Sequence, residues 1–209
     1  MPTLLLTGFG PFPGAPFNPT GPLVQRLARL RRPGLSGVKI VAHVFATGYA
    51  AVDRDLSELI ERHKPDALLM FGLAARSKHI RIETRARNAL ALMPDAQGSS
   101  LLRHAIAPGA PAALALPAPT RQLLGAALAA RVPAALSRDA GRYLCNYLCW
   151  RASETVAGNK GPRLAAFVHV PQVRRDAQPR RRGKRPPAPD DLARAAEFLL
   201  VALAAAARR

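Results

Sequence analysis

The order of apolar runs and amphipathic segments constrains the fold of this 209-residue chain more than any other feature. Short apolar runs predict strands, and segments whose apolar residues recur every three or four positions predict helices. We expect strands at residues 3–7, 38–44, 67–71, 80–87, 134–137 and 164–170, and helices at residues 22–31, 52–63, 120–131, 144–156 and 190–209. This alternation is typical of an α/β domain with a mostly parallel sheet covered by helices.

The length of the chain and the absence of an internal repeat predict one domain over residues 1–209. Hydrophobic residues make up 49% of the chain, which excludes an intrinsically disordered protein. We expect residues 190–209 to form a closing helix with Asp190 or Asp191 as its N-cap. Residues 174–185 precede it with seven basic residues and one acidic residue, which is typical of a solvated loop.

The formal net charge of +18 raises the question of a nucleic acid or another anionic partner. Most of the excess is arginine in a chain rich in alanine and proline, a composition that often reflects codon bias, so we expect no specific nucleic-acid partner. The longest apolar run, residues 198–207, is about half of the ~20 residues that span a bilayer. Residues 1–12 lack the basic start of a signal peptide, and two cysteines are too few for a disulfide scaffold. We therefore expect a cytoplasmic protein without membrane association.

Cys145 lies where an α/β enzyme places a nucleophile. Ala140 and Gly141 predict a turn, and the next helix begins near Leu144. A thiol in the first turn of a helix is close to the positive end of the helix dipole and to unpaired N–H groups, which favour a thiolate and can bind an oxyanion. Position alone does not separate this role from that of a structural cysteine, whereas Cys149, one turn later, is typical of a small buried residue.

His169 lies one residue before the end of the apolar strand at 164–170. Active sites of parallel sheets gather at the carboxyl ends of strands, so His169 and Cys145 would form a base and a nucleophile if they meet in space. A core histidine is the alternative. Glu83 could accept a hydrogen bond from the imidazole and fix its tautomer, or it could instead be a salt-bridge partner in an arginine-rich strand.

The sequence offers no clear cofactor site. The five histidines show no metal-ligand spacing with the cysteines. Residues 8–10 read Gly-Phe-Gly after a strand, but Pro11 follows and spoils a phosphate-cradling loop. We therefore expect neither a metal nor a nucleotide.

Six short motifs stand in an order and spacing that match one known family. They are TGFGPF at residues 7–12, NPT at 18–20, Glu83 with Asn88, PGAPAA at 108–113, AGRYLCN at 140–146 and FVHVP at 167–171. In these motifs the chain resembles the type I pyroglutamyl peptidases, also called pyrrolidone-carboxylate peptidases, a family of cysteine exopeptidases. The resemblance extends from residue 3 to about residue 171, about four-fifths of the chain.

The resemblance implies a three-layer α/β/α sandwich of the phosphorylase/hydrolase-like kind, with a mostly parallel twisted sheet. It implies a cofactor-free enzyme that removes an N-terminal pyroglutamyl (5-oxoproline) residue from small peptides. Cys145 would be the nucleophile, His169 the base and then the acid, and Glu83 the residue that orients His169. The substrate-binding residues would be Phe9, Phe12, Asn18, Tyr143 and Leu144. A homodimer or homotetramer is the corresponding expectation for assembly.

Two segments depart from the family pattern. The family has GQAGGR after the third strand, whereas residues 72–77 read GLAARS, so Leu73 replaces the glutamine. The family's VDDAR is absent from residues 89–94, which read ALALMP, and its arginine has no clear counterpart. Both segments lie in the substrate-shaping region. A related cysteine amidohydrolase with altered specificity therefore stays an alternative, as does a non-catalytic member of the fold.

Overall fold

The computed structural model describes residues 1–12, 14–158, 161–174 and 187–209. Its strands are β1 (Thr3–Phe9), β2 (Lys39–Phe45), β3 (Ala67–Leu73), β4 (Ile80–Glu83), β5 (Arg85–Arg87), β6 (Ala113–Ala115), β7 (Ala134–Ser137) and β8 (Leu164–Val170). Its helices are α1 (Thr20–Ala28), α2 (Tyr49–His63), α3 (Thr120–Ala129), α4 (Leu144–Ala157) and α5 (Pro189–Ala207), with a 3₁₀ turn η1 (Pro33–Leu35). Most of the predicted basic loop at 174–185 lies outside the described residues.

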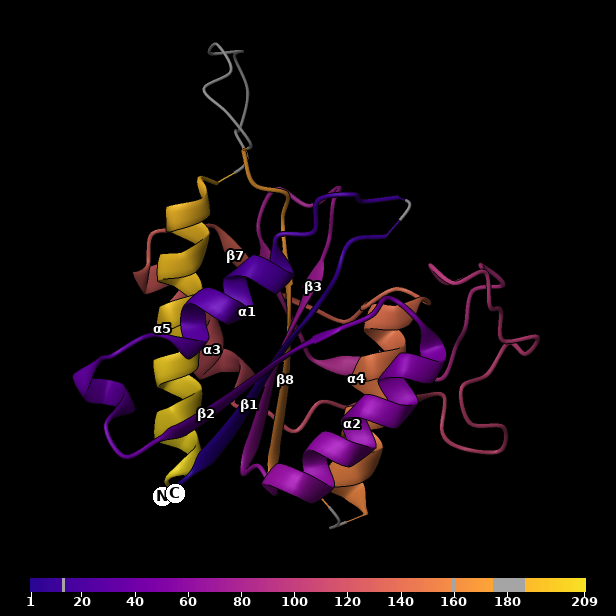
Figure 1. Ribbon diagram of the computed structural model, residues 1–209, viewed down its shortest axis with the longest axis horizontal. Helices are drawn as coiled ribbons and strands as arrows, with labels where there is room; N and C mark the ends of the chain where they lie inside the picture. Colours follow the sequence, from indigo (N-terminus) through magenta and orange to yellow (C-terminus); the bar gives the residue numbers. More distant parts are fainter. Residues whose placement is uncertain (13, 159–160, 175–186) are drawn as a thin grey trace.

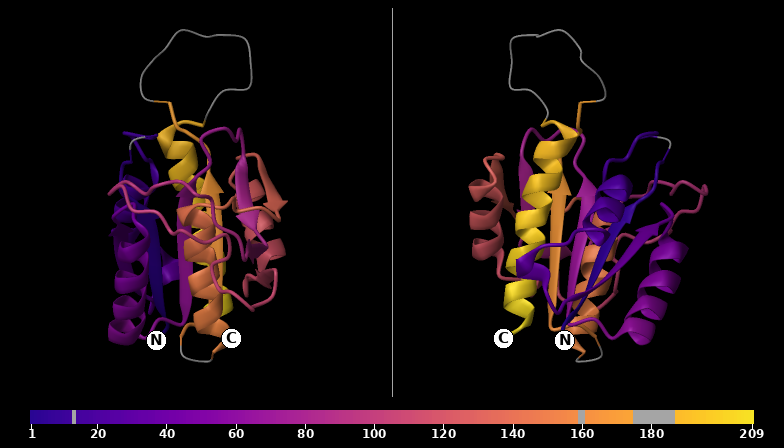
Figure 2. Two further views of the ribbon diagram at one scale, coloured as in Figure 1. Left: turned by 90° about the vertical axis from the view of Figure 1, so that its right-hand side faces the viewer. Right: turned by 60° about the vertical axis from the view of Figure 1, so that its left-hand side comes forward.

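A central sheet has the strand order β2-β1-β3-β8-β4-β7. β2, β1, β3 and β8 are parallel, whereas β4 runs antiparallel to β8 and is parallel to β7. Figures 1 and 2 show α2 and α4 on one side of this sheet and α1, α3 and α5 on the other. The expected three-layer α/β/α sandwich with a mostly parallel sheet is therefore confirmed.

Two hydrophobic cores lie on opposite faces of the central sheet, because side chains alternate between the faces along each strand. On β3, Leu69 and Phe71 join the cluster under α1, α3 and α5, whereas Leu68 and Met70 join the cluster under α2 and α4. All four side chains are fully buried. A strand that is apolar on both faces is what a sheet covered by helices on both sides requires. The strand predicted at residues 67–71 is therefore confirmed, and its near-continuous apolar character follows from burial on both faces.

The predicted strand at 80–87 is wrong as a single element. The chain leaves the central sheet after Glu83, where the N–H of Thr84 donates to the carbonyl oxygen of Ser137 at 2.8 Å. β5 then pairs with β6 in a separate two-stranded antiparallel sheet. The alternating pattern of residues 80–87 continues through both strands, because each has one buried and one more exposed face, so periodicity does not reveal the break.

Some helix boundaries in the structure differ by a few residues from those predicted. The helix expected at 22–31 begins at Thr20 and ends at Ala28. The N-cap of α5 is Ala188 rather than Asp190 or Asp191, because Pro189 occupies the first helical position, where its fixed φ and missing N–H cost nothing. Asp191 instead accepts a hydrogen bond from the N–H of Ala188, at 3.3 Å. Among the described residues, no helix has both the length and the apolar character needed to cross a membrane.

Candidate active site

Cys145 is the second residue of α4, and no side chain of the described residues caps the N-terminus of this helix. The N-cap, Tyr143, has an extended backbone and provides no side-chain cap. Gly141, in the preceding turn, has a φ of +84°, a conformation that favours glycine, and its N–H donates to Oδ1 of Asp139 at 3.0 Å. The first N–H groups of a helix have no partner within it. The thiol therefore lies beside free backbone donors and the positive end of the helix dipole.

His169 lies near the carboxyl end of β8, directly across from Gly72 of β3. A Cβ atom at Gly72 would lie 2.7 Å from Sγ of Cys145 and 2.6 Å from Cζ of Phe167. Glycine at position 72 therefore makes room for the thiol against the sheet. Cys145 and His169 line the same pocket, and the thiol is near enough to the imidazole to act on its pKa.

Glu83 completes a line of three interacting groups. Its Oε1 atom lies 2.8 Å from Nδ1 of His169, and its side chain is fully buried. The antiparallel β4 pairs Arg81 with His169, which leaves Glu83 diagonally opposite the histidine on the same face of the sheet. Nη2 of Arg81 lies 3.3 Å from the same Oε1 atom. Oε2 of Glu83 has no hydrogen-bond partner among the described residues.

Charges in this line favour a protonated histidine. Burial disfavours the imidazolium, but the Cys145 and Glu83 side chains, through charge and hydrogen bonds, outweigh it and raise the pKa of His169 to about 9. Cys149, one helical turn beyond Cys145, is completely buried, and that burial raises its pKa well above the ordinary value. Cys149 therefore stays a neutral thiol, while Cys145 is the cysteine that faces a base.

A pocket of about 180 Å³ opens beside Cys145 and His169. All five of the predicted substrate-binding residues line it, namely Phe9, Phe12, Asn18, Tyr143 and Leu144. Its volume is well below the ~300–1,000 Å³ of pockets for drug-sized ligands, so it suits one small group. Its walls are mainly apolar and aromatic, which favours an uncharged group.

Sequence reasoning missed part of the pocket wall. Thr47 and the segment 140–142 also line it, whereas Leu73, which also lines it, lies in a segment already expected to shape the substrate site. The signal for Thr47 was its place just after the carboxyl end of β2, the same edge of the sheet that carries His169. Its Oγ1 atom donates to the carbonyl oxygen of Gly10 at 3.2 Å.

Three asparagines from the motifs singled out in the sequence hold loops through hydrogen bonds to the backbone. Asn18 donates to the Gly10 carbonyl oxygen at 3.1 Å and accepts from Oγ1 of Thr20 at 2.9 Å, so its amide holds the loop after β1. Asn88 similarly holds residues 107–110. Asn146, next to Cys145 and fully buried, accepts from the N–H of Arg87 and donates to the carbonyl oxygens of residues 87 and 89. Asn18 therefore fixes a loop of the pocket wall, and Asn146 ties the start of α4 to the segment 87–89.

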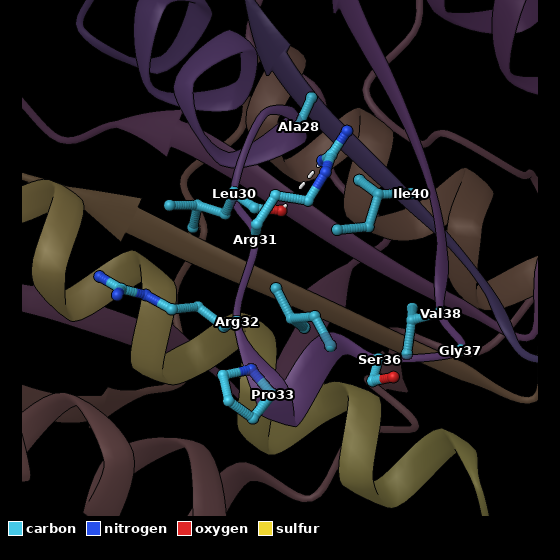
Figure 3. Close-up of a pocket in the computed structure, with 10 residues that line it drawn as sticks. Ala28, Leu30, Arg31, Arg32, Pro33, Ser36, Gly37, Val38 and Ile40 are labelled. Atoms are coloured by element: carbon cyan, nitrogen blue, oxygen red, sulfur yellow. Dashed lines mark hydrogen bonds between the residues drawn. The ribbon is translucent and has the colours of Figure 1, made fainter.

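A larger hollow of about 680 Å³ lies elsewhere, between the end of α1, η1 and the start of β2 (Figure 3). Arg31 and Arg32 are at its edge, and Arg31 donates to the carbonyl oxygen of Leu30 at 3.1 Å. None of the described residues that line it is a cysteine, a histidine or a carboxylate. Among the described residues, no group of three or more histidine, cysteine or acidic side chains could hold a metal ion. The described lining of this hollow therefore lacks the nucleophile and base that the smaller pocket contains.

Comparison with known proteins points to one family. The sequence profile of the family described as "Pyroglutamyl peptidase" matches residues 2–208. The pyrrolidone-carboxylate peptidase of Gloeobacter violaceus is 36% identical over 171 residues, covering 81% of this chain and 82% of the relative. That of Deinococcus radiodurans is 35% identical over 176 residues, covering 82% and 78%. The crystal structure of Bacillus amyloliquefaciens pyroglutamyl peptidase I superposes with a TM-score of 0.84 at 27% identity, covering 98% of each chain.

Proposed function

The chain belongs to the pyroglutamyl peptidase family, and on that premise we propose that Cys145, His169 and Glu83 hydrolyse the amide bond after an N-terminal pyroglutamyl residue. The observation that carries the proposal is the His169–Glu83 hydrogen bond beside Cys145, with Cys145 and His169 lining one small apolar pocket. A nucleophile, a base and a group that orients the base are the parts that amide hydrolysis needs.

The first half of the reaction transfers the pyroglutamyl group to sulfur. The Cys145 thiolate attacks the carbonyl carbon of the pyroglutamyl residue, and a C–S bond forms as the carbonyl oxygen takes the negative charge. Backbone N–H groups at the open start of α4 are placed to stabilise that oxyanion. The C–N bond then breaks, and protonated His169 gives its proton to the leaving amine. A thioester remains on Cys145.

The second half returns the enzyme to its starting state. Neutral His169 accepts a proton from a water molecule, which attacks the thioester carbonyl. The C–S bond breaks, pyroglutamic acid leaves, and the thiolate and imidazolium form again. Throughout, Glu83 accepts the hydrogen bond from Nδ1, which presents Nε2 to the reacting atoms and stabilises the imidazolium. The two half-reactions balance in atoms and charge without an external oxidant, reductant or metal.

The pocket supports a neutral lactam as the group that is recognised. Phe9, Phe12 and Leu144 provide an apolar wall on which a five-membered ring can pack. A free glutamyl group would bring an amine and a carboxylate into this apolar space, at a desolvation cost that the ring avoids. The pocket wall therefore supports selection of a cyclised over an open N-terminal residue.

The test is release of a fluorescent amine from a pyroglutamyl amide by the wild type and by Cys145→Ala. Release by the wild type that disappears in the variant supports both the reaction and the nucleophile. A folded wild type that releases nothing would refute the proposal. A panel of other N-terminal residues would then separate an amidohydrolase of altered specificity, for which Leu73 in the pocket wall is the structural reason, from a non-catalytic protein.

We also propose that residues 1–209 act as one peptidase domain on small peptides, in a reducing compartment such as the cytoplasm. Both cysteines of the chain are free, and a reducing environment keeps Cys145 as a thiol. A homo-oligomer, dimer or tetramer, is the assembly that we propose on the family resemblance, and light scattering at several concentrations tests it.

A further inference from the structure

Arg142 is a charged side chain in the wall of an otherwise mostly apolar pocket. It is exposed, and its guanidinium has no hydrogen-bond or ion-pair partner among the residues that the structure describes. Its backbone carbonyl oxygen accepts a hydrogen bond from the N–H of Ala91, which fixes the main chain but leaves the side chain free. A cation is therefore available at the mouth of the pocket.

The local fold gives no stabilising reason for a cation at position 142. Arg142 immediately precedes Tyr143, the N-cap of α4. A positive side chain at this end of a helix is repelled by the helix dipole, which favours anions there. The exposed side chain gains little from packing. An arginine at this place favours the approach of a negatively charged group from solution.

Asp139, the acidic residue nearest to Arg142 along the chain, is already paired with another arginine, and Arg138 beside it offers no further acidic partner. Arg87 forms an ion pair of 3.0 Å with Asp139, whose Oδ1 atom also accepts the N–H of Gly141. Burial would raise the pKa of Asp139, but these hydrogen bonds and the charge of Arg87 outweigh it and lower that pKa. Asp139 is thus already satisfied. Arg85 donates to the carbonyl oxygen of Arg138, and the structure gives Arg138 no ionic partner among the described residues.

We propose that Arg142 selects peptides with a carboxylate in the residue directly after the pyroglutamyl group. The inference rests on the proposed function. The pyroglutamyl ring fills the small pocket next to Cys145, so the rest of the peptide leaves the pocket across its exposed mouth, where Arg142 lies. A guanidinium can bind a carboxylate with two parallel hydrogen bonds, and Arg142 is the residue of the pocket wall that provides one.

The experiment compares kcat/KM for the amides of pyroglutamyl-glutamate, pyroglutamyl-glutamine and pyroglutamyl-lysine, which are similar in length and differ in charge. We expect the glutamate peptide to exceed the lysine peptide about tenfold at low salt, with glutamine between them, since one exposed ion pair is worth up to about fivefold. The ratio should shrink at ~0.5 M NaCl. Pyroglutamyl-glutamine with a free carboxyl terminus tests whether a main-chain carboxylate is recognised as well as a side-chain one.

Variants assign the preference to Arg142. Arg142→Gln should reduce the glutamate-to-lysine ratio at least threefold, and Arg142→Lys should keep most of it. Arg121→Gln is the matched control, because Arg121 is an exposed arginine on α3, on the opposite face of the sheet. The Arg121→Gln variant should have the same glutamate-to-lysine ratio of kcat/KM as the wild type. Equal kcat/KM for the three amides, or a ratio that Arg142→Gln leaves unchanged, would overturn the inference while hydrolysis of the glutamine peptide still supports the proposed function. Failure to cleave any of the peptides would overturn both.

Discussion

Oε1 of Glu83 lies 2.8 Å from Nδ1 of His169, although 86 positions separate the two residues along the chain. The contact exists because β4 pairs antiparallel with β8, at the boundary between the four parallel strands β2, β1, β3 and β8 and the parallel pair β4 and β7. In this antiparallel pairing, Glu83 of β4 lies diagonally across from His169, near the end of β8. The antiparallel strand thus decides which carboxylate orients the histidine.

The two cysteines should respond differently to substitution. Cys145→Ser should lower kcat/KM by at least ~10³-fold, because the weaker nucleophile faces the same base. Cys149→Ala should keep most of the activity and cost about 1–2 kcal/mol of unfolding free energy, because it leaves a small void in a fully buried position. Steady-state kinetics and denaturant unfolding measure the two effects. Loss of activity in both variants with intact folding would contradict the assignment of Cys145.

Replacement of Glu83 by glutamine should lower kcat about 10³-fold with little change in KM. The amide keeps the shape of the side chain but no longer carries the charge that stabilises the His169 imidazolium and its tautomer. Kinetics on a pyroglutamyl amide provide the measurement, and circular dichroism checks the fold. A variant with wild-type kcat would show that Glu83 has no part in orienting His169.

The pH dependence of activity should have an alkaline limb near pH 9. The pKa of His169 is raised from 6.5 to about 9, so its protonated form stabilises the folded state fully below about pH 6.5, and this contribution is lost as pH rises to about 9. The same deprotonation removes the acid that the leaving amine needs. A profile of kcat/KM against pH tests this. Glu83→Gln should move the limb to lower pH, and an unmoved limb would speak against the coupling.

Gly72→Ala should both destabilise the fold and reduce activity. The added Cβ atom would meet Sγ of Cys145 at 2.7 Å, so the thiol or the strand must shift, at a cost of about 1–3 kcal/mol. Gly125→Ala is the control, because Gly125 lies exposed in α3 with nothing within 4 Å of an added Cβ atom. That variant should be as stable as the wild type or up to about 1 kcal/mol more stable. Thermal unfolding and kcat/KM of both variants decide the matter.

Arg81 should act as a positioning residue for Glu83. Its Nη2 atom lies 3.3 Å from Oε1 of Glu83, and Ser137 holds the same guanidinium through Oγ at 2.7 Å. We expect Arg81→Gln to lower kcat about tenfold with a smaller change in KM, and Arg81→Lys to restore part of the loss. If both variants lost only stability, with kcat per folded molecule unchanged, Arg81 would be structural alone.

Several local features could be predicted because each depends on residues close in sequence. The strand at residues 164–170 and the start of α4 at Leu144 lie where the apolar pattern and the Gly141 turn indicated. The break after Glu83 could not be predicted, because the alternating pattern is the same in β4 and in β5. The N-cap of α5 was also misplaced, since an acidic residue near Pro189 can serve inside the first turn as well as before it.

The sequence by itself determined the elements of the sandwich, and it put Cys145 at a helix start and His169 at a strand end, because hydrophobic periodicity and turn residues act over a few positions. Only the tertiary structure decided which carboxylate reaches the histidine, why position 72 must be glycine, and that Arg142 lies at the pocket without a partner among the described residues. These features are distances between segments far apart in the chain. Such distances depend on strand order and direction, which local periodicity does not encode.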